Sequence, residues 1–135
     1  MIKSILAIIF GSVLMAQAGL SRLEALSMLE TGDRDSAVFV WEEAGGLVGF
    51  CSVRVEPSPA AMVEASRAEI ADLGVRADQR REGIGRALAL AARTWAGARG
   101  AERLEVRVAA RNPEGQAFWR ALGYEGFVDV LHRRL

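Results

Sequence analysis

A glycine-rich turn between a strand and a helix is the feature that most constrains the fold of this chain. Residues 80–86 read RREGIGR, between an alternating run at 68–75 and a helix-like run at 84–99. Glycine lets backbone N–H groups approach an anion, and a helix N-terminus presents its positive dipole end there, so this order predicts a phosphate-binding site. The spacing excludes a Walker A loop, which needs Gly-Lys-Ser/Thr. It also excludes a dinucleotide fingerprint, because Leu88 stands where the third glycine would be.

The composition is that of one globular domain without a charge bias. The 135 residues include 17 basic and 17 acidic side chains, so no electrostatic argument favours a nucleic acid as partner. This length is sufficient for one substantial core. Cys51 is the only cysteine, which excludes an intramolecular disulfide and a cysteine-based zinc site. We therefore expect no metal.

The first 18 residues leave three interpretations open. One positive charge, an apolar run and the ending Ala16-Gln17-Ala18 are typical of a secretory signal peptide. The uncharged stretch 4–21 is also barely long enough for a membrane anchor. The third interpretation is a buried first strand over residues 4–10. We treat residues 1–18 as a separate apolar segment and residues 19–135 as a single domain.

The rest of the sequence predicts strands and helices in a mixed order. A capping box from Ser21 to Glu24 predicts a helix that ends near Gly32. Asn112 at an N-cap position and Gly123 past the last turn predict a third helix, after the one at 84–99. Strands are expected at residues 37–41, 47–55, 68–75, 104–108, 125–128 and 131–135. This order predicts a mixed α/β (α+β) fold.

The glycine-rich turn resembles the Arg/Gln-x-x-Gly-x-Gly/Ala motif of the GNAT family of N-acetyltransferases, with Arg80, Gly83 and Gly85 at the fixed positions. Residues 112–124 (NPEGQAFWRALGY) are similar to the family's Asn-…-Ala-x-Phe-Tyr-…-Leu-Gly-Phe segment. The resemblance extends over residues 36–135. It implies a mostly antiparallel central sheet with flanking helices, and acetyl-coenzyme A held at the turn between the strand, the glycine loop and the helix.

The resemblance also implies which residues bind the coenzyme. The pantetheine arm would pair with the backbone of Leu73, Gly74 and Val75. Gly74 would permit close approach, or else be a bulge glycine. The N–H of Val75 would donate to the thioester oxygen as an oxyanion hole. Asn112 would contact the pantetheine arm or only cap its helix, and Phe118 would border the coenzyme channel. The pyrophosphate would lie at Arg80, Arg81, Glu82, Gly83, Ile84, Gly85 and Arg86, with Glu82 turned outward.

A general base is suggested at Glu69, six residues before Val75, because the histone-modifying branch of the family has its glutamate at this offset. Simple strand alternation places Glu69 on the face of Leu73 and Val75, with Asp72 on the opposite face. Asp72 is the second candidate for the base. The alternative for Glu69 is a solvated glutamate at the start of a strand.

Trp119 departs from the family pattern. It stands where relatives have the tyrosine that is thought to protonate the departing thiolate, and an indole N–H cannot do this. Two hypotheses follow: an enzyme that moves the acetyl group of acetyl-coenzyme A to a primary amine by direct attack, or a catalytically weak acyl-coenzyme A-binding or regulatory domain. A small-molecule or protein amine, and a homodimer, remain open. The cytosolic coenzyme implies a cytoplasmic protein, unless residues 1–18 export or anchor the chain.

Overall fold

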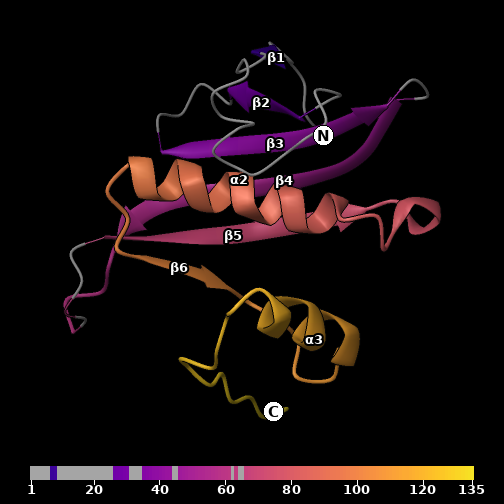
Figure 1. The fold of residues 1–135 in the computed structure, drawn as a ribbon. Helices are drawn as coiled ribbons and strands as arrows, with labels where there is room; N and C mark the ends of the chain where they lie inside the picture. Colours follow the sequence, from indigo (N-terminus) through magenta and orange to yellow (C-terminus); the bar gives the residue numbers. More distant parts are fainter. Residues whose placement is uncertain (1–6, 9–25, 31–34, 44–45, 62, 64–65) are drawn as a thin grey trace.

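The computed structural model describes residues 7–8, 26–30, 35–43, 46–61, 63 and 66–135. The described strands form one sheet in the order β1-β2-β3-β4-β5-β6 (Figure 1). They are β1 (Ala7–Ile8), β2 (Leu26–Glu30), β3 (Ser36–Glu43), β4 (Gly46–Pro57), β5 (Ser66–Val75) and β6 (Arg103–Val106). Neighbouring strands are antiparallel except β5 and β6, which are parallel because helix α2 (Ile84–Ala98) crosses over between them. Helix α3 (Pro113–Ala121) follows β6. The predicted mixed, mostly antiparallel fold is confirmed.

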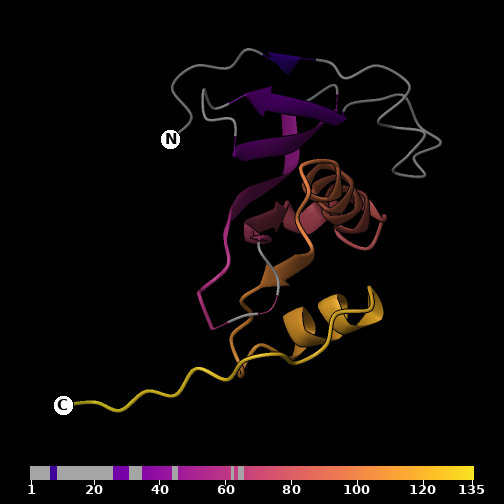
Figure 2. The ribbon, with the colours of Figure 1, turned by 90° about the vertical axis from the view of Figure 1, so that its left-hand side faces the viewer.

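Helix α2 covers one face of the sheet (Figure 2). The face predicted from periodicity, with Leu88, Ala91, Ala92 and Trp95, is buried as expected. It packs into one apolar cluster with residues that alternate along the strands, among them Phe39, Cys51, Val53 and Ile70. Five of the buried α2 residues are alanines, which have little side chain to separate the helix from the sheet; they stand at 87, 89, 91, 92 and 96. The opposite face of the sheet is called the outer face below.

The helix predicted from the capping box at Ser21 is wrong in its second half. Residues 26–30 form strand β2, which pairs with β3 from Leu26 opposite Trp41 to Glu30 opposite Ala37. The helical signal was only three apolar positions at intervals of three, whereas a strand here provides backbone partners for residues 37–41 on the second edge of β3. Residues 21–25 lie outside the described part of the chain.

The two closing strands predicted at 125–128 and 131–135 are also wrong. These residues have no regular secondary structure, and their apolar side chains at Phe127, Val128, Val130 and Leu131 are exposed. Alternation of apolar residues makes a strand only where a neighbouring strand completes the ladder, and no described strand pairs with this segment. The guanidinium of Arg103 lies 4.3 Å from the ring centroid of Phe127, which ties the start of the segment to β6.

The N-terminal segment is described only at β1, where Ala7 and Ile8 pair with Leu29 and Met28 of β2. These two residues lie within the range 4–10, where a buried first strand is one of the three interpretations of this segment. The other residues on which the signal-peptide and anchor interpretations depend lie outside the described part. Among the helices that the structure describes, none combines the length and the apolar character needed to cross a lipid bilayer.

Candidate functional site

The predicted glycine-rich turn joins the end of β5 to the start of α2. Gly83 is the N-cap of α2 and has a φ of 83°, in the left-handed region where a side chain is unfavourable. No side chain caps this helix end, and its first turn contains no acidic residue. The first N–H groups of a helix have no partner within the helix. The turn therefore presents backbone donors and the positive end of the helix dipole at one point.

The charged side chains of the turn are all exposed. Arg81, Glu82 and Arg86 extend to solvent around the N-terminus of α2, and Arg76 pairs with Asp78 at 2.9 Å. Arg80 is different, because its Nε donates to the carbonyl oxygen of Val75 at 3.2 Å. Arg80 therefore links the turn to the last residue of β5. Its guanidinium lies where the glycine loop and the strand end meet.

Arg81 adopts a strained backbone conformation, with a φ of 66°, and it is the only non-glycine residue with positive φ among those described. Replacing Arg81 by Gly should raise the free energy of unfolding by up to about 1 kcal/mol, because glycine removes the left-handed strain. Arg76→Gly is the comparison, since Arg76 has a φ of −53°, so glycine there relieves no strain, adds flexibility and removes the exposed ion pair with Asp78. Thermal unfolding without ligand measures both. Equal destabilisation of the two variants would contradict the prediction.

Strand β5 is paired with β6 over only part of its length. The parallel register runs from Arg67 opposite Arg103 to Ile70 opposite Val106. Beyond Ile70, β5 continues to Val75, whereas the chain after β6 diverges towards α3 (Figure 1). Residues 71–75 therefore have no described strand on the side away from β4. We call this side of β5 the open edge. Apart from the Val75 carbonyl, which accepts from Arg80, backbone groups on this side have no strand partner among the described residues and can pair with an extended ligand.

A β-bulge at Ala71 reverses the faces predicted for the second half of β5. Ser52 lies opposite Asp72 and Val53 opposite Ile70, so Ala71 is an extra residue in the ladder. Leu73 and Val75 consequently join the core beneath α2. The prediction that Glu69 shares a face with Leu73 and Val75 is wrong for this reason. Glu69 and Asp72 instead lie together on the outer face, where they pair with Arg54 and Ser52 of β4.

Gly74 is not a bulge glycine, although the sequence left that interpretation open. A Cβ atom at Gly74 would lie 2.7 Å from Cε1 of Phe50, its cross-strand neighbour. Such a distance is too short for any real contact, so the absence of a side chain at Gly74 makes room for the Phe50 ring. The bulge itself lies three residues earlier, at Ala71.

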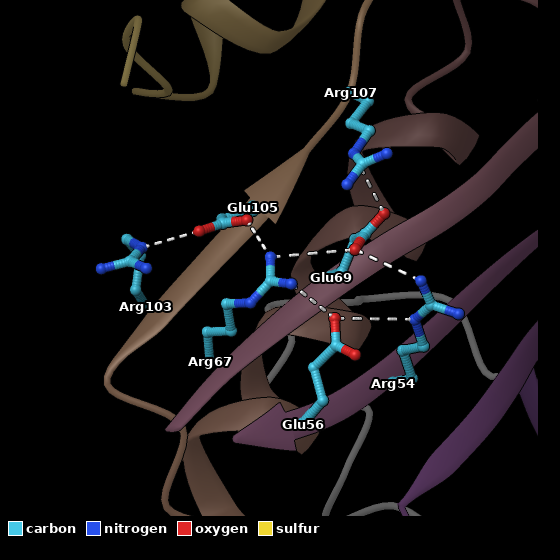
Figure 3. Close-up of polar contacts among 7 residues, drawn as sticks. All are labelled: Arg54, Glu56, Arg67, Glu69, Arg103, Glu105 and Arg107. Atoms are coloured by element: carbon cyan, nitrogen blue, oxygen red, sulfur yellow. Dashed lines mark hydrogen bonds and ion pairs between the residues drawn. The ribbon is translucent and has the colours of Figure 1, made fainter. Parts of the chain in front are cut away.

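Glu69 is the one buried charged residue among those described, with 6% of its surface exposed. Its Oε2 lies 3.4 Å from Nη2 of Arg54 and 3.9 Å from Nη1 of Arg67. Its Oε1 lies 3.7 Å from Nε of Arg107 (Figure 3). A general base needs a carboxylate oxygen that is available to accept the proton of the substrate. Both carboxylate oxygens of Glu69 already face guanidinium groups. Arg67 also pairs with Glu56 and Glu105, and Arg103 pairs with Glu105. We call these seven residues the arginine cluster.

Asp72 has much simpler surroundings. Ser52 Oγ donates to Asp72 Oδ2 at 3.3 Å, and no guanidinium of the described residues lies within ion-pair distance of this carboxylate. The side chain is exposed and lies just past the point where β5 and β6 separate. A shallow hollow on the same side of the sheet is lined by Ser36, Ala37, Val38, Ser52, Val53, Arg54 and Ala71.

Helix α3 brings an aromatic group to the glycine-rich turn. Two ring atoms of Phe118 lie 3.4 Å from the position of a Cβ on Gly85, and Cγ2 of Val75 lies 3.6 Å from the same position. Phe118 therefore packs between α3, the start of α2 and the end of β5. The predicted N-cap is present, because Asn112 Oδ1 accepts a hydrogen bond from the N–H of Gly115 at 3.0 Å. Gly123, with a φ of 91°, lies just after this helix, as the sequence indicates.

Trp119 is a core residue and is 7% exposed. Its ring makes edge-to-face contacts with Phe118, at 4.9 Å between centroids, and with Tyr124, at 5.0 Å. Burial, together with the neighbouring Cys51, raises the pKa of Tyr124 to about 12 despite an opposing effect of Arg93. Neither aromatic ring therefore offers an exposed, readily ionised acid. Tyr124 serves in packing.

Cys51 is not suited to be a nucleophile. It is fully buried under α2, and burial, followed by the nearby carboxylate of Asp72, raises the pKa of its thiol from 9.0 to about 12. Only the thiolate is a strong nucleophile. The geometry therefore gives no support to a covalent intermediate at this residue.

Sequence reasoning identified the turn, β5 and α3 but missed several residues of the outer face. Arg54 and Ser52 belong to β4, Arg107 follows β6, and Phe50 covers Gly74. None of them stands in a local motif. Their proximity follows from the strand register, and the register depends on a bulge that no glycine or proline signals.

Comparison with known proteins is consistent with this architecture. The profile of the acetyltransferase (GNAT) family matches residues 12–124. Among solved structures, the aminoglycoside N-acetyltransferase AAC(6')-Iy in complex with CoA is similar with a TM-score of 0.69. The two are 19% identical, and the match covers 77% of this chain and 78% of that one.

Two further structures are similar to this chain. A candidate acetyl transferase from Pyrococcus furiosus has a TM-score of 0.68 and 26% identity, over 77% of this chain and 68% of that one. A mutant protein from Bacillus halodurans has a TM-score of 0.69 and 23% identity, over 76% and 67%. A search of curated proteins found no match. Because the family profile spans most of the sequence, the chain belongs to the acetyltransferase (GNAT) family.

Proposed function

We propose that this protein transfers the acetyl group of acetyl-coenzyme A to a primary amine by direct attack within a ternary complex. The proposal rests on the position of two structural features next to each other. The open edge of β5 ends at the uncapped N-terminus of α2, with Arg80 linking them. An extended arm that ends in phosphates matches both features at once.

The coenzyme's pyrophosphate would accept hydrogen bonds from the first N–H groups of α2, after Gly83, with Arg80, Arg81 and Arg86 around it. Its pantetheine arm would pair with the open edge at Leu73, Gly74 and Val75, flanked by Phe118. Asn112 would need to keep its capping bond while facing the arm. The likeness to AAC(6')-Iy, solved in complex with CoA, supports this arrangement.

In the proposed reaction the amine nitrogen attacks the thioester carbonyl carbon, and the C–S bond then breaks to release the coenzyme as a thiolate. The backbone N–H of Val75 would donate to the oxygen that becomes negative. We assign the proton of the amine to Asp72, because this carboxylate is exposed beside the open edge and holds only one hydroxyl donor. Glu69, the base expected from sequence, would then position the arginines that surround it.

Trp119 supports a second candidate function, that of a domain which binds acyl-coenzyme A with little or no turnover. The thiolate of the product has a pKa near that of a free thiol, about 8.5, so it can depart without a protein acid. We therefore favour the enzyme. Release of free coenzyme A from acetyl-coenzyme A in the presence of a broad panel of amines tests it. Binding of the coenzyme without release under any condition would favour the second function.

Replacing Trp119 by Tyr should give no gain in kcat, because the side chain at this position lies in the core and not at the open edge. The smaller ring and the buried hydroxyl should lower the free energy of unfolding by about 1–3 kcal/mol. Steady-state kinetics and thermal unfolding measure the two effects separately. A large increase in kcat would mean that a phenol at this position reaches the thiolate.

A further inference from the structure

The outer face beside the open edge carries a graded strip of side chains. Residues 50, 52 and 54 of β4 point to this face, and their partners on β5 are residues 74, 72 and 69. The strip therefore begins at the Phe50 ring over Gly74, continues to Asp72 with Ser52, and ends at Glu69 with Arg54. It passes from apolar to acidic to guanidinium-rich over three strand positions.

Two arginines of the arginine cluster have more N–H donors than their contacts with Glu69 use. Arg54 and Arg107 have side chains that are 51% and 79% exposed, and each meets Glu69 through a long contact of 3.4 or 3.7 Å. A guanidinium carries five N–H donors, so each can bind a second anion without releasing Glu69. Arg67 differs, because it is 16% exposed and is committed to Glu56 and Glu105. In Figure 3, Arg54 and Arg107 approach Glu69 from opposite sides.

Asp72 supplies the opposite charge at a defined separation. It lies two β4 positions from Arg54, at Ser52, which corresponds to about 7 Å along the strand. An exposed carboxylate and the exposed Arg54 at this spacing match a molecule that carries an ammonium and a carboxylate close together. The shallow hollow adjoins the Arg54 end of this strip, because it is lined by Ser52, Arg54 and Ala71 together with residues 36–38 of β3.

We propose that the acceptor is a free amino acid, with its carboxylate bound by Arg54 and Arg107 and its ammonium at Asp72. The proposal rests on the proposed acetyl transfer. Asp72 takes one proton from the ammonium, and the neutral nitrogen forms a bond to the acetyl carbon. The C–S bond breaks, and the nitrogen loses its second proton as the thiolate gains one. The products are an N-acetylated amino acid and free coenzyme A, with one proton released to solvent. A polycationic acceptor is disfavoured by the same arginines.

Matched acceptors test this directly. Phenylalanine is compared with phenethylamine and tyrosine with tyramine, and release of free coenzyme A is followed for each. We expect kcat/KM to be at least tenfold higher for the amino acids. Arg54→Gln and Arg107→Gln should each raise KM for the amino acid about tenfold, leave the decarboxylated amine unaffected and preserve stabilisation by acetyl-coenzyme A. Arg133→Gln, on the exposed C-terminal segment, is the control and should change none of these values.

The outcomes distinguish the proposed acceptor class from the proposed acetyl transfer on which it rests. Turnover of the decarboxylated amines as fast as of the amino acids would overturn the acceptor class while leaving acetyl transfer intact. Equal losses for both members of a pair in Arg54→Gln would also overturn it, since the arginine would then act on the fold and not on the carboxylate. Stabilisation by acetyl-coenzyme A without turnover of any amine would instead remove the proposed enzyme function itself.

Discussion

Asp72→Asn is expected to lower kcat/KM for amine acetylation by about 10²-fold or more, because it removes the carboxylate that receives the amine's proton. Asparagine keeps the size of the side chain and can still accept from Ser52 Oγ, so the fold should be unaffected. Initial rates of coenzyme A release, measured from about pH 6 to pH 9, test this effect. For an amine with a pKa of about 10, the neutral fraction rises with pH, so the loss of rate should be smallest at the highest pH.

Glu69→Gln is the informative comparison for Asp72→Asn. Removing the charge of Glu69 leaves Arg54, Arg67 and Arg107 without their shared partner. We therefore expect a lower free energy of unfolding and a higher KM for the acceptor, with a smaller loss of kcat than in Asp72→Asn. If Glu69→Gln were instead the variant with the greater loss of kcat, the base would be Glu69, as its offset from Val75 suggests.

Acetyl-coenzyme A is expected to stabilise the protein by about 2.7 kcal/mol at 100 times its Kd. In a domain of this size that corresponds to a rise in Tm of several degrees. Arg80→Ala should abolish most of this shift at the same ligand concentration, because it removes a guanidinium from the phosphate site and its bond to the Val75 carbonyl. Differential scanning fluorimetry with a ligand titration measures Kd for both proteins.

Two controls make the coenzyme experiment decisive. Arg133→Ala removes an exposed arginine far along the sequence from the turn and should keep the full shift. Adenosine 3′,5′-bisphosphate at the same concentration tests whether phosphates alone stabilise the protein. A full shift in Arg80→Ala would mean that the backbone donors of α2 suffice. No shift in the unmodified protein would contradict the coenzyme site altogether.

Local signals in the sequence predicted much of the fold and of the local structure of the candidate site. The turn, the apolar face of α2 and the caps at Asn112 and Gly123 depend on interactions within a few residues, and they were correct. The errors concern interactions over longer distances. Strand β2 depends on its ladder with β3, and the C-terminal segment lacks a neighbour to make it a strand. Simple alternation predicted that Glu69 shares a face of β5 with Leu73 and Val75. This was wrong because the bulge at Ala71, which follows from pairing with β4, lies between them.

The departure at Trp119 has a similar explanation. The resemblance implies a phenol where this chain has an indole, but only the structure places that indole in the core, against Phe118 and Tyr124. The arginine cluster could not be foreseen, since its seven members come from β4, β5, β6 and the residue after β6.

The bulge at Ala71 has a consequence for the way this strand can drift in evolution. In the first half of β5, even-numbered residues such as Ala68 and Ile70 are confined to the core, and odd-numbered ones face the outer side of the sheet. After Ala71 the parity is exchanged, so that Leu73 and Val75 are confined and Asp72 is free. Selection for a new acceptor could therefore act on residues 67, 69 and 72 while the core positions between them stay fixed.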